Sequence, residues 1–178
     1  WLAQMPVTRY LTLGDHRFLL VHATPRDPMD EYIGDNVEQW QQRLEHVDVD
    51  FVCVGHTHIP MQLQLEKTQV INPGSVGQPR DGDPRAAYAI IEKGQVEFRR
   101  VPYDIDQTIR HMQSCGIDES VIAKAEIVLR MAVARLPPDR LNSEKTPWKI
   151  LGCQDPFERS SRVFPVFLNR ADDGGPKV

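Results

Sequence analysis

The chain has 178 residues, 40% of them hydrophobic, which predicts one modest domain whose core buries most of its apolar surface. A formal net charge of -4 argues against the basic face that nucleic-acid binding needs, and the longest apolar runs are only a few residues, so neither a nucleic acid nor a membrane is an expected partner. Three cysteines without Cys-x-x-Cys spacing are typical of reduced thiols in a cytoplasmic protein, which is the location we expect.

Two short strands joined by a tight turn are predicted first. Residues 10–13 and 17–21 flank Gly14-Asp15, and glycine at the first loop position favours a type II′ hairpin. His22 then leaves the second strand. A lone histidine after an apolar strand is more often a buried, hydrogen-bonded residue than a metal ligand, so its meaning depends on what lies near it.

A helix and a buried strand follow. Apolar residues recur at helical spacing from 36 to 47, with Asp35 or Asn36 as the N-cap. The apolar run 51–54 then leads into Gly55-His56-Thr57-His58, which completes a β-α-β unit. In an extended backbone His56 and His58 project to the same side of the chain, an arrangement that suits a metal.

Downstream of this unit the pattern changes to antiparallel strands. Residues 61–66 alternate apolar with polar side chains, 70–71 form the next strand, and strands 88–92 and 96–101 flank the hairpin signal Lys93-Gly94. We expect these strands to form the second sheet of a β-sandwich flanked by helices, in an α/β (α+β) fold. One sheet edge is expected to be exposed, which would favour a homo-oligomer or a protein partner there.

The C-terminal third has a different composition. Asp104 and Asp118 are suited to cap two amphipathic helices, the first ended by Gly116, and these helices can form a helical hairpin. We therefore divide the chain into a domain over 1–102, a helical extension over 103–136, and an irregular tail over 137–178.

Three segments in fixed order resemble the motifs of one enzyme family. They are Val21-His22-Ala23-Thr24-Pro25-Arg26-Asp27-Pro28, Gly55-His56-Thr57-His58, and Asn72-Pro73-Gly74-Ser75-Val76-Gly77-Gln78-Pro79-Arg80. Over about residues 10 to 102 the chain resembles the calcineurin-like metallophosphoesterases, especially their small bacterial and archaeal phosphodiesterase branch. The resemblance implies that His22 and His56 bind one divalent metal and His58 a second. Mn²⁺, Zn²⁺, Fe²⁺ and Ni²⁺ are the candidates, and no catalytic acid or base is assigned.

The family's carboxylate-bearing motifs do not precede His22. Asp-x-His, Gly-Asp and Gly-Asn-His are missing from the 21 residues ahead of it. Two cations held about 3.5 to 4 Å apart repel strongly unless carboxylates lie between them, so three histidines suit one open metal site better than a two-metal clamp. We therefore expect the C-terminal portion of a longer polypeptide that binds one metal or none by itself. Substitution of the missing ligands by Asp27, Asp81 or Asp83 is not expected.

The same resemblance implies substrate-binding residues. It places Asn72 and Ser75 beside the metals, where Arg80, together with Arg26, can add charge-assisted contacts to a phosphate. The glycines of this loop have a simpler interpretation as turn residues. His16, His46 and His111 have no such context, and we interpret them as structural or solvent-exposed.

The function that we expect is hydrolysis of a phosphodiester or phosphomonoester, a small substrate, by metal-activated water. Two alternatives stay open because the carboxylate motifs are missing. One is a non-catalytic scaffold that keeps the fold and binds proteins, and the other is a single-metal-binding module without turnover.

Overall fold

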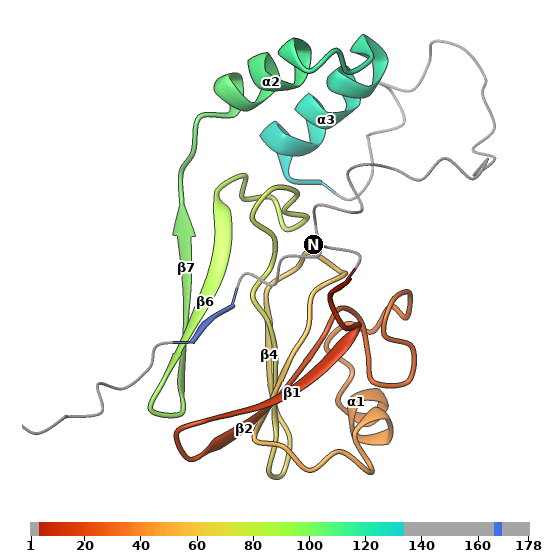
Figure 1. Cartoon of the computed structure of the whole chain (residues 1–178), viewed down its shortest axis with the longest axis vertical. Helices are drawn as coiled ribbons and strands as arrows, with labels where there is room; N and C mark the ends of the chain where they lie inside the picture. The colour runs from red at the N-terminus through yellow and green to blue at the C-terminus, as the bar shows by residue number, and fades with distance from the viewer. Residues whose placement is uncertain (1–3, 134–165, 169–178) are drawn as a thin grey trace, which may run out of the picture.

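The structure, a computed structural model, describes residues 4–133 and 166–168. Its elements in chain order are β1 (Thr8–Leu13), β2 (His16–Val21), α1 (Val37–Arg43), β3 (Phe51–Cys53), β4 (Met61–Gln64), β5 (Gln69–Asn72), β6 (Ala86–Glu92), β7 (Gln95–Val101), α2 (Ile105–Ser114), α3 (Glu119–Met131) and β8 (Val166–Leu168). Figure 1 shows α1 on the outer side of one sheet, and the β6–β7 hairpin on the other side of that sheet. This is the predicted sandwich of sheets flanked by helices.

The larger sheet has five strands in the order β1-β2-β3-β5-β4. β2, β3 and β5 run parallel, while β1 and β4 are antiparallel to their neighbours and form the edges among the described residues. The prediction that residues 61–66 and 70–71 belong to the second sheet is wrong. β5 lies between β3 and β4, and it is buried along most of its length because Val70 and Ile71 pack into the apolar clusters on the two faces of the sheet.

The predicted hairpins and the β-α-β unit are confirmed. Gly14 and Gly94 have φ of 57° and 77° in the two hairpin loops, the conformation that favours glycine. Asn36 caps α1 by accepting a hydrogen bond from the Gln39 N–H at 2.9 Å. The helix ends earlier than predicted, because the Val47 N–H bonds to the Leu44 carbonyl in a tighter i to i+3 turn.

The second sheet contains three strands in the order β7-β6-β8. β8 pairs parallel with β6 within the segment 137–178, for which we expected irregular structure. The other residues of that segment lie outside the described residues.

The predicted helical hairpin is confirmed. Asp104 and Asp118 cap α2 and α3, and Gly116 follows α2 with a φ of 72°. A separate apolar cluster fills the space between the helices, with Ile109, Met112 and Leu129 at its centre. Figure 1 shows the pair beyond the end of β7, away from α1. No helix in the described part of the chain is long and apolar enough to cross a membrane.

The larger sheet is covered on both faces, which explains the apolar runs in the sequence. Trp40 of α1 packs with Leu19 and Val52 in one cluster, whereas Phe18 and Phe51 lie in another that includes residues of β6. Parallel strands buried on two sides need continuous rather than alternating apolar residues. The loops that follow β2 and β3 therefore leave a rigid, doubly covered sheet at one edge.

Candidate metal and phosphate site

Two of the predicted metal ligands meet where β2 and β3 end. These strands are adjacent and parallel, with Leu20 opposite Cys53, so the residues that follow them emerge together. The Gly55 N–H donates to the His22 carbonyl at 2.9 Å, and His22 Nε2 lies 3.0 Å from His56 Nδ1. The fold thus brings together two imidazoles that are 34 residues apart in sequence.

The third predicted ligand, His58, lies in the same turn two residues after His56. His56 and His58 both have a φ of 60°, and the Thr57 N–H bonds to the Gly55 carbonyl at 2.7 Å. The extended backbone that we predicted here is wrong, because the backbone is left-handed at both histidines. This conformation is uncommon for residues other than glycine, and strained backbone of this kind is enriched at functional sites.

His58 is oriented by the loop that follows β5. Its side chain is mostly buried, at 9% exposure, and its Nδ1 lies 2.8 Å from the Gln78 carbonyl oxygen. A carbonyl can only accept, so Nδ1 carries the proton and Nε2 of the neutral ring keeps its lone pair. Burial, together with the positive charge of Arg80, lowers the pKa of His58. The ring is therefore neutral at pH 7, the form in which imidazole binds metals.

Asn72 holds the histidine turn in place. It is 1% exposed, and its amide nitrogen donates to the Gly55 carbonyl at 2.6 Å and to the Thr57 hydroxyl at 2.9 Å. Its amide oxygen accepts from the Gly74 N–H at 2.9 Å. The side chain predicted to bind substrate thus ties the ends of β3 and β5 together. A role in substrate binding stays a prediction.

Ser75 and Arg80 support the same turn from the loop that follows. The Ser75 hydroxyl accepts from the Gln78 N–H at 2.9 Å, and the Arg80 N–H donates to the His58 carbonyl at 3.2 Å. Gly74 has a φ of 89°, and a Cβ there would lie 2.9 Å from Pro60, so glycine is required both by the backbone and by the packing. This agrees with its interpretation as a turn residue.

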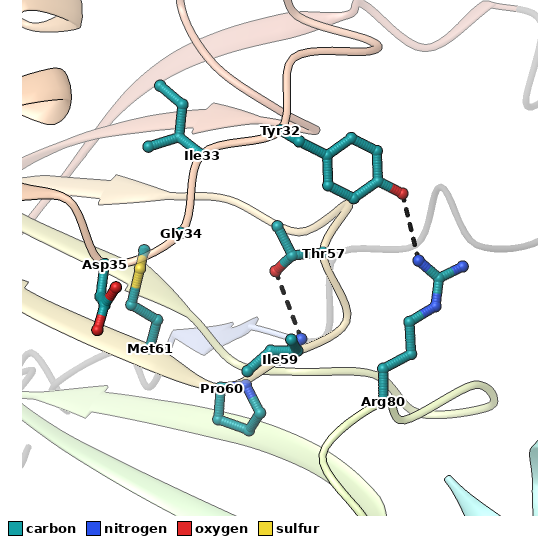
Figure 2. A pocket seen from close by; sticks show the side chains of 9 residues that line it. All are labelled: Tyr32, Ile33, Gly34, Asp35, Thr57, Ile59, Pro60, Met61 and Arg80. Carbon is teal, nitrogen blue, oxygen red and sulfur yellow. Dashed lines mark hydrogen bonds between the residues drawn. The ribbon is translucent and has the colours of Figure 1, made fainter. Parts of the chain in front are cut away.

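Tyr32 lies beside the histidine pair, although no pattern in the sequence predicted it. Its ring centroid lies 4.1 Å from that of His56, and the Arg80 guanidinium donates to its hydroxyl at 3.2 Å. Figure 2 shows the side chains of Tyr32 and Arg80 facing each other from separate loops. Tyr32 therefore connects the histidine pair with the one predicted cationic residue that reaches this side of the site.

Arg26 is directed to a carboxylate rather than to the histidines. Its side chain is 62% exposed and pairs with Glu31, which also receives hydrogen bonds from Arg43 and Thr24. Burial alone would raise the pKa of Glu31, but the hydrogen bonds and the two arginine charges outweigh it and lower that pKa. This network, which sequence reasoning missed, fixes the loop that follows His22.

Three aspartates considered as substitute ligands are engaged elsewhere. Asp81 and Asp83 pair with Arg100 of β7, and Asp27 accepts from backbone N–H groups of its own loop. The Arg100 side chain is 17% exposed, so these ion pairs are mostly buried.

A pocket of about 450 Å³ opens beside the histidine turn. Its nine lining residues are Tyr32, Ile33, Gly34, Asp35, Thr57, Ile59, Pro60, Met61 and Arg80. Most are apolar, and the two charged ones lie at opposite sides of the view in Figure 2. The pocket shares Thr57 with the histidine turn and Tyr32 with the ring contact to His56, so the two features are continuous.

The histidine pair fits one divalent metal. Two nitrogens bound to one tetrahedral ion at about 2.0 to 2.1 Å lie roughly 3.3 Å apart, close to the 3.0 Å between His22 Nε2 and His56 Nδ1. Within residues 4–133 and 166–168, no group of three or more His, Cys, Asp or Glu side chains is arranged to hold a metal. The spacing of the histidine pair is thus compatible with two of the positions around one metal.

Comparison with known proteins places this geometry in a family. The family described as "Calcineurin-like phosphoesterase superfamily domain" matches residues 1–95. An uncharacterised protein of Methanocaldococcus jannaschii is 31% identical over 128 residues, 59% of this chain and 49% of that protein. A probable metallophosphoesterase of Mycoplasma genitalium is 29% identical over 99 residues, 51% of this chain and 56% of that protein. The chain thus spans about half the length of these relatives.

Two solved structures have a fold similar to that of this chain. A metallophosphoesterase from Sphaerobacter thermophilus has 34% identity and a TM-score of 0.57, covering 69% of this chain and 59% of that one. A hypothetical protein from Pyrococcus horikoshii OT3 has a TM-score of 0.62, covering 72% of this chain and 52% of that one, and at 21% identity it supports the fold alone.

Proposed function

Because the chain belongs to the calcineurin-like phosphoesterase superfamily, we propose that it forms the histidine-bearing part of a metal-dependent hydrolase of phosphate esters. The family is metal-dependent, and membership supports a phosphoesterase function in general terms. The observation that carries the proposal is the 3.0 Å approach of His22 Nε2 to His56 Nδ1 at the ends of two parallel strands. We propose these two atoms as ligands of one metal, and His58 Nε2 as a ligand of a second.

A divalent metal supplies, when bound, a Lewis acid and a water of lowered pKa. The residues of this chain bind and orient the substrate around it. The Arg80 guanidinium donates a hydrogen bond to the hydroxyl of Tyr32, whose ring contacts His56. From this position Arg80 can bind the anionic phosphate through charge-assisted hydrogen bonds. Asn72 and Gln78 hold the histidine turn and the His58 ring, so that the geometry needs no rearrangement when substrate arrives.

Further parts of the proposal follow from the same residues. We propose Mn²⁺ as the working metal, with Zn²⁺, Fe²⁺ and Ni²⁺ as competitors, and Ser75 and Arg26 as outer contacts to a phosphodiester or phosphomonoester. A cytoplasmic location is proposed because the thiols of Cys53 and Cys115 are free.

One observation favours the protein-binding alternative. The described residues contain no complete group of three metal-binding side chains, which is what a non-catalytic scaffold would show. The edge strands β1 and β4 would be the place for a protein partner.

The test is Mn²⁺-dependent hydrolysis of bis(4-nitrophenyl) phosphate by the 178-residue chain and by a version extended upstream in its reading frame. We expect His56→Ala to lower the rate at least about 100-fold in whichever form is active, since it removes a ligand. His46→Ala is the matched control, because His46 is exposed after α1. Zinc binding without hydrolysis in both forms would favour the metal-binding module.

A further inference from the structure

We propose that the pocket beside the histidine turn receives the organic group of the phosphate ester, and that it selects esters of a bulky apolar group such as an aryl ring. This inference rests on the proposed function, because it assigns the part of the substrate that the metals do not contact. The pocket has a volume of about 450 Å³ and shares Thr57 and Tyr32 with the histidine site.

The charges around the pocket set the direction in which an ester would bind. Arg80 donates a hydrogen bond to the hydroxyl of Tyr32, which contacts His56, whereas Asp35 lies on the opposite side of the pocket in Figure 2. An anionic phosphoryl group is attracted to the first side and repelled from the second. The organic group must therefore point away from Arg80, toward the part of the pocket that Met61 lines.

The lining defines the chemistry of that group. Apart from the two charged residues, Gly34 and the Thr57 hydroxyl at the histidine turn, the lining consists of the ring of Tyr32 and the apolar Ile33, Ile59, Pro60 and Met61. Such a lining gains free energy by burying apolar surface and offers few partners to a polar or charged group. A sugar or a second charged phosphate would lose hydration there without replacement.

The walls are held in place before any ligand arrives. On one side, the Trp40 indole N–H donates to the Gly34 carbonyl at 2.8 Å, and Ile33 is buried in the core. On the other, Pro60 packs closely on Gly74 and Met61 begins β4. A preformed pocket loses little conformational entropy on binding, so discrimination between organic groups can be strong.

The test compares two non-hydrolysable probes, phenylphosphonate and methylphosphonate, in the presence of Zn²⁺, with ¹³C-labelled methionine methyl groups as reporters. The chain has five methionines. Met61 lines the pocket, and Met112 is buried between α2 and α3, so it reports whether the fold changes elsewhere. Met61→Leu assigns the signal. We expect phenylphosphonate to bind at least tenfold more tightly and to shift Met61 but not Met112.

A pair of variants checks that the lining causes the preference. Ile59 is 45% exposed and lines the pocket, while Val76 is 53% exposed and does not line it. Ile59→Ser should reduce the preference for phenylphosphonate severalfold, and Val76→Ser should leave it unchanged. Equal affinity for both probes, or binding of phenylphosphonate without a Met61 shift, would overturn this inference and leave the phosphoesterase proposal standing. Failure of both probes to bind would contradict both.

Discussion

The histidine turn and the helical hairpin are built on opposite principles. The hairpin is regular, with aspartate caps on α2 and α3 and an apolar cluster between them. The turn has two histidines at a φ of 60° and a buried asparagine that bonds to three backbone or hydroxyl groups. Regular local structure stabilises the helical hairpin, whereas long-range hydrogen bonds hold the histidine turn in a backbone conformation that its own residues disfavour.

The largest expected contrast concerns thiol reactivity. Burial raises the pKa of Cys53 in β3 to about 12, while Cys115 at the end of α2 is exposed. Because the thiolate is the reactive form, Cys115 should react with a disulfide reagent on the order of a thousand times faster than Cys53 at pH 8. Peptide mapping in a Cys153→Ser background measures both rates. Comparable labelling of the two thiols in the folded protein would show that β3 is not buried.

Two substitutions that lower the free energy of unfolding by similar amounts should differ in their effect on metal binding. Asn72→Ala removes the bonds that hold the histidine turn, and Ile109→Ala opens a cavity between α2 and α3; each should cost roughly 3 kcal/mol of unfolding free energy. Only Asn72→Ala should also weaken Mn²⁺ binding. Urea unfolding and metal titration on both variants test this. Equal loss of metal affinity in Ile109→Ala would mean that the two regions are coupled.

Glycine and alanine should have opposite effects in the two regions. His56→Gly should be about 1 kcal/mol more stable than His56→Ala, because a φ of 60° penalises any Cβ. In α3, Ala123→Gly should lose about 1 kcal/mol, because glycine is a poor helix former. Thermal or urea unfolding of the three variants gives both differences. If alanine were the more stable residue at both positions, His56 would not occupy the left-handed region in solution.

The smallest effect concerns pH. The pKa of Glu31 lies below its ordinary value in the folded chain, so its ionised form contributes stability above the unfolded pKa and loses it as the pH falls through the folded pKa. The stability difference between the wild-type chain and Glu31→Gln should therefore shrink from pH 6 toward pH 3. A difference that stays constant over this range would show that the contacts of Glu31 do not depend on its charge.

Local patterns predicted the regular parts of the molecule well. Asn36, Asp104 and Asp118 cap helices, and Gly14 and Gly94 turn hairpins, because each signal depends on a few neighbouring residues. Which of the two sheets a strand joins was harder to predict. Nothing local distinguishes β5 beside β3 from a strand of the second sheet, since pairing is decided by contacts between distant segments.

The candidate site shows the same division. His22, His56 and His58 were predicted as ligands from the order of three motifs, but the left-handed backbone at His56 and His58 was not predicted. Tyr32 lies in a loop without periodicity, and only the fold brings it against His56 and Arg80. Side chains that act through distant partners carry no local signature.

The most direct test of the account is paramagnetic broadening of the six histidine ring signals by substoichiometric Mn²⁺. We expect His22 and His56 to lose their signals first and together, since each is proposed to contribute a nitrogen to one metal. His46 and His111, which are exposed elsewhere, should keep theirs. Equal broadening of all six rings, or none at His22 and His56, would contradict the assignment of this histidine pair as a metal site.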